Sequence, residues 1–95
     1  MYLKGVMQTL EIQIFGKVQG VFFRKNASEK AHELGITGTV ENRPNGSVKA
    51  IATGTNDSLK KFLEWCKVGN TPAEVDDVEV AEVDLKEFAE FKILR

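Results

Sequence analysis

The amino-acid sequence predicts an α+β domain in which an antiparallel sheet carries two helices on one face. Three observations support this prediction: segments of alternating polar and apolar residues, two segments with helical apolar spacing, and a β-α-β-β-α-β order along the chain. The chain has 95 residues, of which 42% are hydrophobic and 28% charged, and its formal net charge is −1. This composition is typical of a single small domain, which we expect to span residues 1–95.

The first half of the chain begins with a strand, a loop and a helix. Residues 9–15 alternate between polar and apolar side chains, which predicts a half-buried strand. Residues 16–22 break this alternation and contain two glycines, so a loop is expected there. The first helix follows, with Gly35 as its expected stop. Its apolar residues recur at helical spacing: Phe23, Ala27, Ala31 and Leu34.

A hairpin and a second helix occupy the middle of the chain. Residues 37–43 and 47–53 read as strands, and the Arg43-Pro44-Asn45-Gly46 sequence between them favours a tight turn. Thr55 is a suitable N-cap for the second helix, and Gly69 is expected to end it. The apolar stripe of this helix consists of Leu59, Phe62, Leu63 and Cys66.

The last part of the chain predicts a fourth strand over residues 78–85 and a possible short fifth strand over 91–94. The apolar residues of the fourth strand change parity along its length, and a one-residue bulge near Ala81 would reconcile them. The complete order is that of a ferredoxin-like βαββαβ two-layer sandwich. Such a fold supports many activities, so function must be inferred from particular residues.

A glycine-containing loop before a helix is the clearest indication of a binding site. Residues 16–22 precede a helix N-terminus, where backbone N–H groups and the positive end of the helix dipole favour an anion. Arg24 lies in the first helical turn, and its guanidinium is suited to binding a phosphate through two hydrogen bonds. A tight turn with a surface arginine explains the same residues equally well.

Two motifs favour the anion site over the simple turn, because both resemble motifs of a known protein family. Residues 14–24 read Ile-Phe-Gly-Lys-Val-Gln-Gly-Val-Phe-Phe-Arg and resemble the first signature of the acylphosphatase family, an aliphatic residue and then Gly-x-Val-Gln-Gly-Val-x-Phe-Arg. A second group of residues matches the family's spacing around its catalytic asparagine: Gly38, Val40, Asn42, Gly46, Val48 and Gly54. The resemblance extends from about Thr9 to Ile93.

The resemblance implies metal-independent hydrolysis of acyl phosphates to a carboxylate and inorganic phosphate, without a covalent enzyme intermediate. Arg24 matches the arginine that binds the phosphate, and Asn42 matches the asparagine that positions the attacking water. Inorganic phosphate or sulfate is expected to bind at the same site, and no cofactor is implied. The phosphate-binding loop matches Gly16, Lys17, Val18, Gln19, Gly20, Val21 and Phe22.

Several residues depart from the family pattern. Thr39 stands where an aromatic residue is usual, and Glu41 where a basic or neutral residue is usual. Strand alternation places Glu41 on the face opposite Asn42, so its repulsion of the substrate should be modest. The family's Gly-Pro-Pro stretch is matched only loosely by residues 69–72, and its aromatic C-terminus is replaced by Ile93-Leu94-Arg95. Residues 1–6 precede the usual family start and are expected to form a flexible extension.

The remaining reactive side chains have simpler interpretations. The single cysteine, Cys66, excludes an internal disulfide and is expected to be a buried thiol. His32 is the one histidine and is expected at the surface. Lys17, Lys25 and Arg43 flank the site and either attract anions or are simply solvated. Residues 74–90 hold eight of the fourteen acidic residues and one lysine, a pattern expected of a solvated edge strand.

Two alternatives from other functional classes remain. Acylphosphatase-like domains also occur in larger proteins such as hydrogenase maturation carbamoyltransferases, as anion-binding modules, but the chain stops at Arg95 and a free-standing enzyme is expected. An RNA-binding domain of the same fold would need exposed aromatic residues on the third strand, and residues 47–53 contain none. We expect a cytoplasmic monomer that acts on a small molecule and binds neither nucleic acid nor a membrane.

Overall fold

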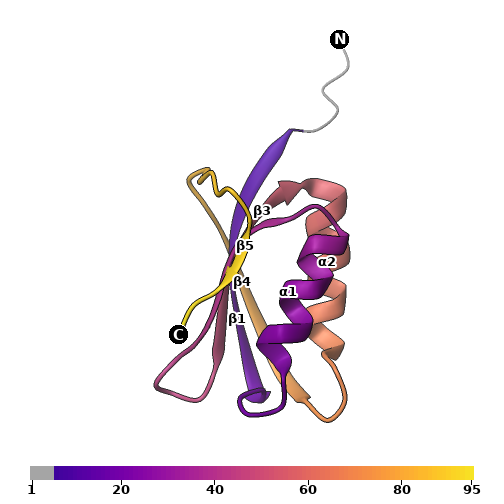
Figure 1. Cartoon of the computed structure of the whole chain (residues 1–95), viewed down its shortest axis with the longest axis vertical. Coiled ribbons are helices and arrows are strands. Elements are labelled where there is room, and N and C mark those ends of the chain that lie inside the picture. The colour runs from indigo at the N-terminus through magenta and orange to yellow at the C-terminus, as the bar shows by residue number, and fades with distance from the viewer. Residues whose placement is uncertain (1–5) are drawn as a thin grey trace.

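A computed structural model describes residues 6–95 and contains the predicted succession of elements (Figure 1). The expected flexible extension at residues 1–6 lies, apart from Val6, outside the described residues. In chain order the elements are β1 (Met7–Lys17), α1 (Phe23–Glu33), β2 (Thr37–Asn42), β3 (Val48–Thr55), α2 (Asn56–Val68), β4 (Glu74–Val83) and β5 (Phe91–Ile93).

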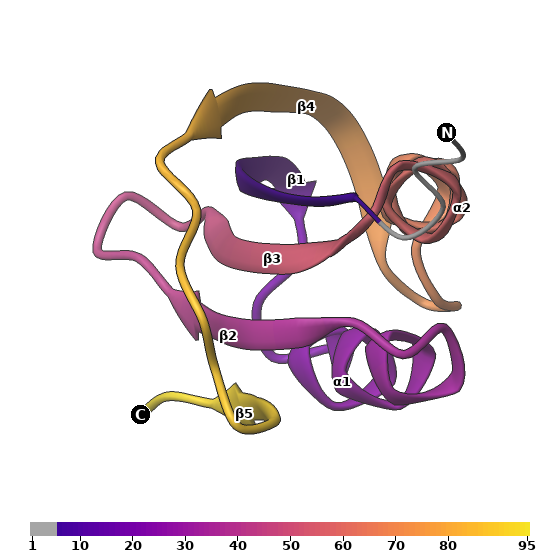
Figure 2. The same ribbon diagram turned by 90° about the horizontal axis from the view of Figure 1, so that it is seen from above.

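The five strands form one sheet in the order β4-β1-β3-β2-β5, and both helices cover the same face (Figure 2). Each helix connects two strands that have another strand between them, as the ferredoxin-like prediction requires. The pairs β1–β3, β1–β4 and β2–β3 are antiparallel. The short strand β5 pairs in parallel with β2, so the complete sheet is mixed.

The core lies between the sheet and the helices and follows the alternation of β1. Ile12 and Ile14 are fully buried toward the helices, and Leu10 lies at the edge of the same row. Phe62 of α2 stacks near Trp65 with ring centroids 6.4 Å apart, and Trp65 also contacts Phe23 at 5.2 Å. The contact between Phe23 and Trp65 packs the N-terminal turn of α1 against α2.

Strand β4 differs from its prediction in two respects: its end points and the location of its bulge. It begins at Glu74 and ends at Val83, and it pairs without interruption from Thr9↔Val83 to Phe15↔Asp77. The predicted bulge near Ala81 is therefore wrong, because the register shift lies between Phe15 and Gly16. At Gly16, with φ of +128°, an added Cβ would lie 2.2 Å from the Glu74 carbonyl oxygen, so the close approach of the two strands there requires glycine.

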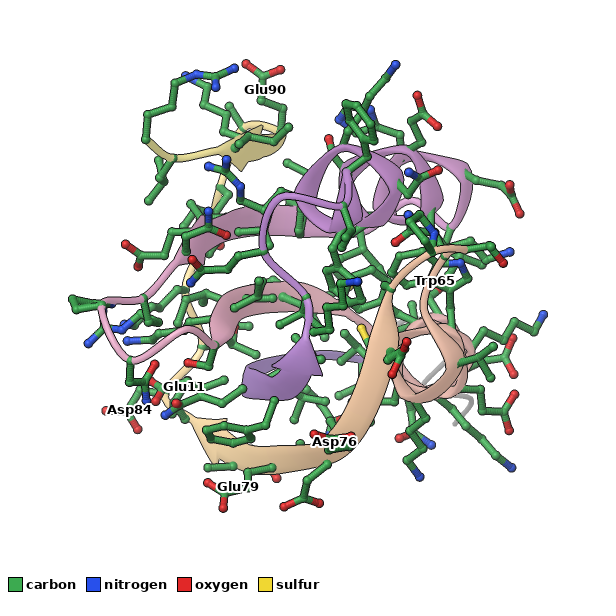
Figure 3. The ribbon with its side chains drawn as sticks, turned by 90° about the horizontal axis from the view of Figure 1, so that it is seen from below. Glu11, Trp65, Asp76, Glu79, Asp84 and Glu90 are labelled. Carbon is green, nitrogen blue, oxygen red and sulfur yellow. The ribbon has the colours of Figure 1, made fainter. Side chains whose placement is uncertain are left out.

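The apolar residues of β4 change from one face of the strand to the other, and this change led to the wrong bulge position. At the sheet edge, apolar residues are tolerated on either face. Val80 faces the same side as the buried Ile12 but is 44% exposed, since the helices cover this edge poorly. The acidic side chains of β4 extend into solvent, as Asp76 and Glu79 show (Figure 3). The expectation of a solvated, charged edge strand is confirmed.

The connection between β4 and β5, residues 84–90, crosses the sheet on the face away from the helices (Figure 2). Two buried threonines in neighbouring strands hold it there. Thr9 Oγ1 accepts a hydrogen bond of 2.9 Å from the Lys86 N–H, and Thr53 Oγ1 donates one of 2.8 Å to the Lys86 carbonyl. This attachment directs the chain toward β5, which follows at Phe91.

Candidate active site

The loop between β1 and α1 has an unusual backbone conformation. Gly20 has a φ of +74°, and Phe22, the residue that precedes α1, has φ +63° and ψ +21°. Glycine adopts this left-handed conformation readily, whereas a bulky side chain adopts it at a cost of roughly 1–2 kcal/mol. A strained aromatic residue at a helix N-terminus, exposed over 73% of its surface, indicates that the loop conformation serves a purpose besides packing.

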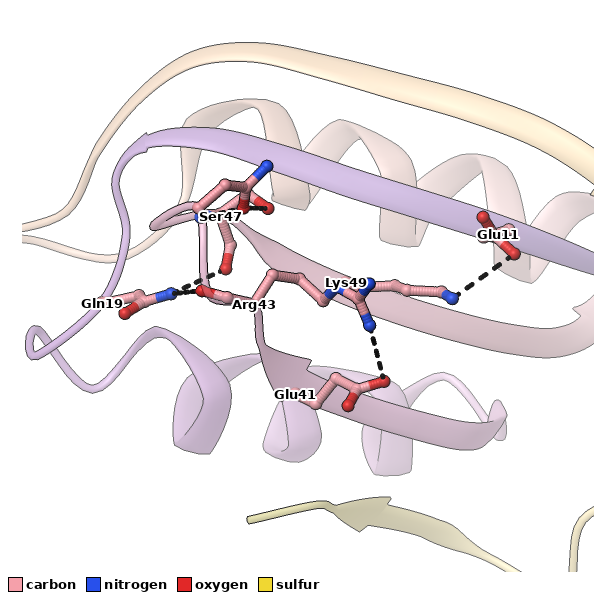
Figure 4. A network of polar contacts seen from close by, with 7 residues as sticks. Glu11, Gln19, Glu41, Arg43, Ser47 and Lys49 are labelled. Atoms are coloured by element: carbon pink, nitrogen blue, oxygen red, sulfur yellow. Dashed lines mark hydrogen bonds and ion pairs between the residues drawn. The ribbon is translucent and has the colours of Figure 1, made fainter.

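Three amide side chains, one from the loop and two from neighbouring segments, fix the loop in place. Gln19 Nε2 donates hydrogen bonds of 2.8 Å to the carbonyls of Arg43 and Ser47, which ties the loop to the β2–β3 hairpin (Figure 4). Asn70 Nδ2 donates a 2.7 Å bond to the Val21 carbonyl. Asn26 Nδ2 donates a 2.9 Å bond to the Phe22 carbonyl. These contacts occupy carbonyl oxygens and leave the peptide N–H groups of the loop unused.

The N–H groups of this loop are available for a ligand. Within residues 6–95, none of the backbone N–H groups of Gln19, Gly20, Val21 and Phe22 donates to another protein atom. The first turn of α1 follows directly, and its own N-terminal N–H groups lack a side-chain cap. The arrangement therefore presents backbone donors and the positive end of a helix dipole at one place.

A cavity of about 440 Å³ beside this loop brings the two predicted catalytic residues together. Arg24 enters it from the first turn of α1, and Asn42 enters it from the end of β2. The Asn42 side-chain oxygen Oδ1 is buried and has no hydrogen-bond partner among residues 6–95. The complete lining is Val18, Gly20, Phe22, Phe23, Arg24, Lys25, Asn42, Ile93 and Arg95.

The C-terminal residues form one wall of the cavity. Arg24 Nη1 donates a 3.2 Å hydrogen bond to the Leu94 carbonyl, and the Leu94 N–H donates a 2.8 Å bond to the Val40 carbonyl. The guanidinium of Arg24 is thereby attached to a residue 70 positions away in the sequence. An arginine retains further N–H donors when one is engaged, so Arg24 remains able to bind an anion.

The predicted loop residues do not all line the cavity. Val18, Gly20 and Phe22 line it, whereas Gly16 forms the β1–β4 irregularity and Lys17 is exposed elsewhere. Gln19 and Val21 support the loop through the hydrogen bonds to the hairpin and to Asn70 described above.

The basic residues expected to flank the site take different positions. Lys25 lines the cavity, but Arg43 does not, because its Nη1 lies 3.9 Å from Glu41 Oε2 on the face away from the helices (Figure 4). Glu41 pairs in register with Lys49 on the face opposite Asn42, as expected, but Glu41 and Asn42 also both line an adjoining hollow of about 380 Å³. Sequence reasoning missed Ile93 and Arg95 as lining residues and Asn70 as a loop support, and no local pattern marks any of them.

The two residues expected to lie outside the site do so. Cys66 is fully buried in the core, and burial raises the pKa of its thiol to about 12, which keeps it protonated at neutral pH. His32 is exposed at the C-terminal end of α1, with Nε2 3.2 Å from the Phe91 carbonyl oxygen. In the described part of the chain, no helix is long and apolar enough to span a bilayer.

Known proteins resemble this chain in both sequence and fold. A family model described as Acylphosphatase matches residues 10–93. An acylphosphatase from Acaryochloris marina is 46% identical over 86 residues, which cover 90% of this chain and 92% of that protein. The structure of an acylphosphatase from Coxiella burnetii superposes with a TM-score of 0.90 at 35% identity, covering 93% of each chain. Full-length HypF, in its phosphate- and nucleotide-bound form, matches 98% of this chain with only 12% of its own length, at 27% identity and a TM-score of 0.87.

Proposed function

The chain belongs to the acylphosphatase family and is an enzyme that hydrolyses acyl phosphates, and on this premise we propose that Arg24, Asn42 and the loop 16–22 carry out the reaction. The cavity shared by Arg24 and Asn42, next to a loop with unengaged N–H groups, is the observation that supports this assignment most strongly. The reaction converts an acyl phosphate and water into a carboxylate and inorganic phosphate.

The phosphoryl group binds to the loop and Arg24. Its charge is neutralised by the N–H groups of residues 19–22, by the dipole of α1 and by the guanidinium of Arg24. Because these donors are fixed before the substrate arrives, little reorganisation is needed when charge spreads over the phosphoryl oxygens in the transition state.

Asn42 orients the attacking water. Its buried Oδ1 accepts a hydrogen bond from that water, which then approaches phosphorus opposite the acyl oxygen. The oxygen–phosphorus bond to water forms while the bond to the acyl oxygen breaks, and the carboxylate leaves with the bonding electrons. A carboxylate is a good leaving group, so a strong base is not required, and the proton of the water passes to the phosphate itself.

A hydrolysis assay with benzoyl phosphate in a chelator-containing buffer tests this assignment. The wild-type chain should hydrolyse the substrate, and inorganic phosphate should inhibit competitively because it occupies the same loop. Asn42→Ala should lower kcat by at least ~10²–10³-fold, by analogy with the loss of a preorganised transition-state donor.

The exposed Asn56 at the start of α2 provides a matched control. Asn56→Ala should retain the wild-type rate, and circular dichroism should show that both variants are folded. Near-full activity in Asn42→Ala, or inhibition by phosphate that is not competitive, would contradict the proposed roles.

A further inference from the structure

The cavity contains residues that the phosphoryl chemistry does not use. Its volume of about 440 Å³ is within the range of about 300–1,000 Å³ typical of sites for complete small molecules. Val18, Gly20, Phe23 and Arg24 belong to the loop signature and line the phosphate end. The rest of the lining, apart from Asn42, consists of Phe22, Lys25, Ile93 and Arg95.

Phe22 and Ile93 give this second part of the cavity an apolar surface. Phe22 occupies a variable position of the loop signature, so the signature itself does not require an aromatic ring there. The ring is 73% exposed and is held at a φ of +63°. An exposed aromatic ring beside a binding cavity is a surface on which a planar or apolar group of a ligand packs.

The charges around the cavity exceed those of a phosphoryl group. Arg24, Lys25 and Arg95 each carry one positive charge, and within residues 6–95 none of them lies within 4.0 Å of a carboxylate oxygen of Asp or Glu. A bound phosphate dianion compensates two of these three side-chain charges, so one lining cation is free to bind another group.

Arg95 is the cation best placed to provide the remaining charge. It also lines an adjoining hollow of about 380 Å³, together with Arg24, Glu41, Asn42 and Leu94. Glu41 is the one carboxylate side chain among these lining residues, and its Oε2 lies 3.9 Å from the Arg43 guanidinium. The guanidinium of Arg95 is therefore left for a ligand that extends beyond the phosphate end.

We propose that Phe22, Ile93 and Arg95 form an acyl-group subsite that selects acyl phosphates with a second anionic group at the far end of the acyl chain. This inference rests on the proposed function, because it assumes that the phosphoryl group binds between the loop and Arg24. The acyl chain packs on Phe22 and Ile93, and its terminal anion pairs with Arg95 at the rim.

Two substrates of equal shape and different charge test the role of Arg95. The probes are 4-carboxybenzoyl phosphate and 4-carbamoylbenzoyl phosphate, which differ in a carboxylate and an amide. In the wild type, kcat/KM should be higher for the carboxylate, and Arg95→Gln should reduce the ratio of the two values by about two- to fivefold, the range of a solvent-exposed ion pair. Because Arg95→Gln removes only the guanidinium charge, the comparison isolates that group.

Lys92 on β5 provides the matched control, because it lies outside both hollows and faces Glu90 at 3.8 Å. Lys92→Gln should retain both the rate and the preference. A second variant tests the apolar part: Phe22→Ala should lower kcat/KM for benzoyl phosphate relative to acetyl phosphate by about two- to tenfold.

The outcomes separate this inference from the function on which it rests. Equal kcat/KM for the two probes in the wild type, or a preference that Arg95→Gln leaves unchanged, overturns the subsite while leaving the hydrolase intact. Failure of the wild type to hydrolyse benzoyl phosphate overturns the proposed function itself. A preference that persists unchanged at high salt also contradicts the subsite, because an ion pair at the rim is screened.

Discussion

The two helices of this protein begin in opposite ways. Helix α2 has a conventional start: Thr55 is extended, its Oγ1 accepts a 3.2 Å hydrogen bond from the Ser58 N–H, and Asp57 places a negative charge in the first turn. Helix α1 follows a left-handed phenylalanine, has no side-chain cap and carries Arg24 and Lys25 in its first turn.

Under the proposed function, this contrast marks the place where helix stability is exchanged for binding. A cap and an acidic residue stabilise a helix N-terminus, whereas cations repel the positive end of the helix dipole. Helix α1 lacks the stabilising features only at its N-terminus. Its C-terminus is conventional, with Gly35 at φ +71° and hydrogen bonds from the N–H groups of Gly35 and Ile36 to the carbonyls of His32 and Ala31. Under the proposed function, the bound phosphoryl group supplies the negative charge that the first turn of α1 lacks.

Among tests of the difference between the two helix N-termini, Arg24→Lys at the start of α1 should have the largest effect. A lysine keeps the charge but loses the planar pair of donors, so kcat/KM for benzoyl phosphate should fall by about 10- to 100-fold. Arg43→Lys is the matched control, since Arg43 faces Glu41 away from the cavity, and its rate should remain close to wild type. Equal rates in the two variants would mean that the geometry of Arg24 is unimportant.

The next effect is stabilisation by inorganic phosphate. If the start of α1 is completed by an anion, phosphate at ten times its Kd should add about 1.4 kcal/mol to the free energy of unfolding. The corresponding rise in Tm is roughly 6–11 °C for a chain of this size, measured by thermal unfolding at constant ionic strength with chloride as the reference. A shift of equal size in Arg24→Lys would indicate that the anion binds elsewhere.

The smallest effect is expected at α2 and should leave activity untouched. Thr55→Ala removes the hydrogen bond to Ser58 and should lower the free energy of unfolding by about 1 kcal/mol, or roughly 4–8 °C in Tm. The rate at 25 °C should not change, because Thr55 lies outside the cavity. If the rate fell in proportion to stability, the two helix starts would not be functionally distinct.

Local sequence patterns predicted the fold well where burial is uniform. The alternation in β1 and the apolar stripe of α2 each describe an element with one well-covered face, and both are confirmed. The pattern failed at β4, because the edge strand has a half-covered inner face and tolerates apolar residues on either side. Gly16, which interrupts the alternation of β1, was the better indication of the irregularity.

The sequence predicted those residues of the candidate site that are adjacent in the chain or belong to a motif. Arg24 and Asn42 were identified by their motifs, and the structure brings them into one cavity. Arg95 and Asn70 were not, because their proximity to the loop depends on how β5 and the α2–β4 connection pack. The basic character of Arg43 suggested a role at the cavity, but Arg43 follows the end of β2 and its guanidinium lies near Glu41 instead.

Arg24 donates a hydrogen bond to the Leu94 carbonyl, so one wall of the cavity includes the C-terminal residues. The two walls therefore differ in how firmly the rest of the molecule holds them. The loop side is held by Gln19 and Asn70 to well-packed parts of the molecule. The opposite side depends on β5, which has only three residues and lies at the sheet edge. Short edge segments open at a lower free-energy cost than a domain unfolds. The wall that β5 supports should therefore open at a lower free-energy cost than the loop side of the cavity.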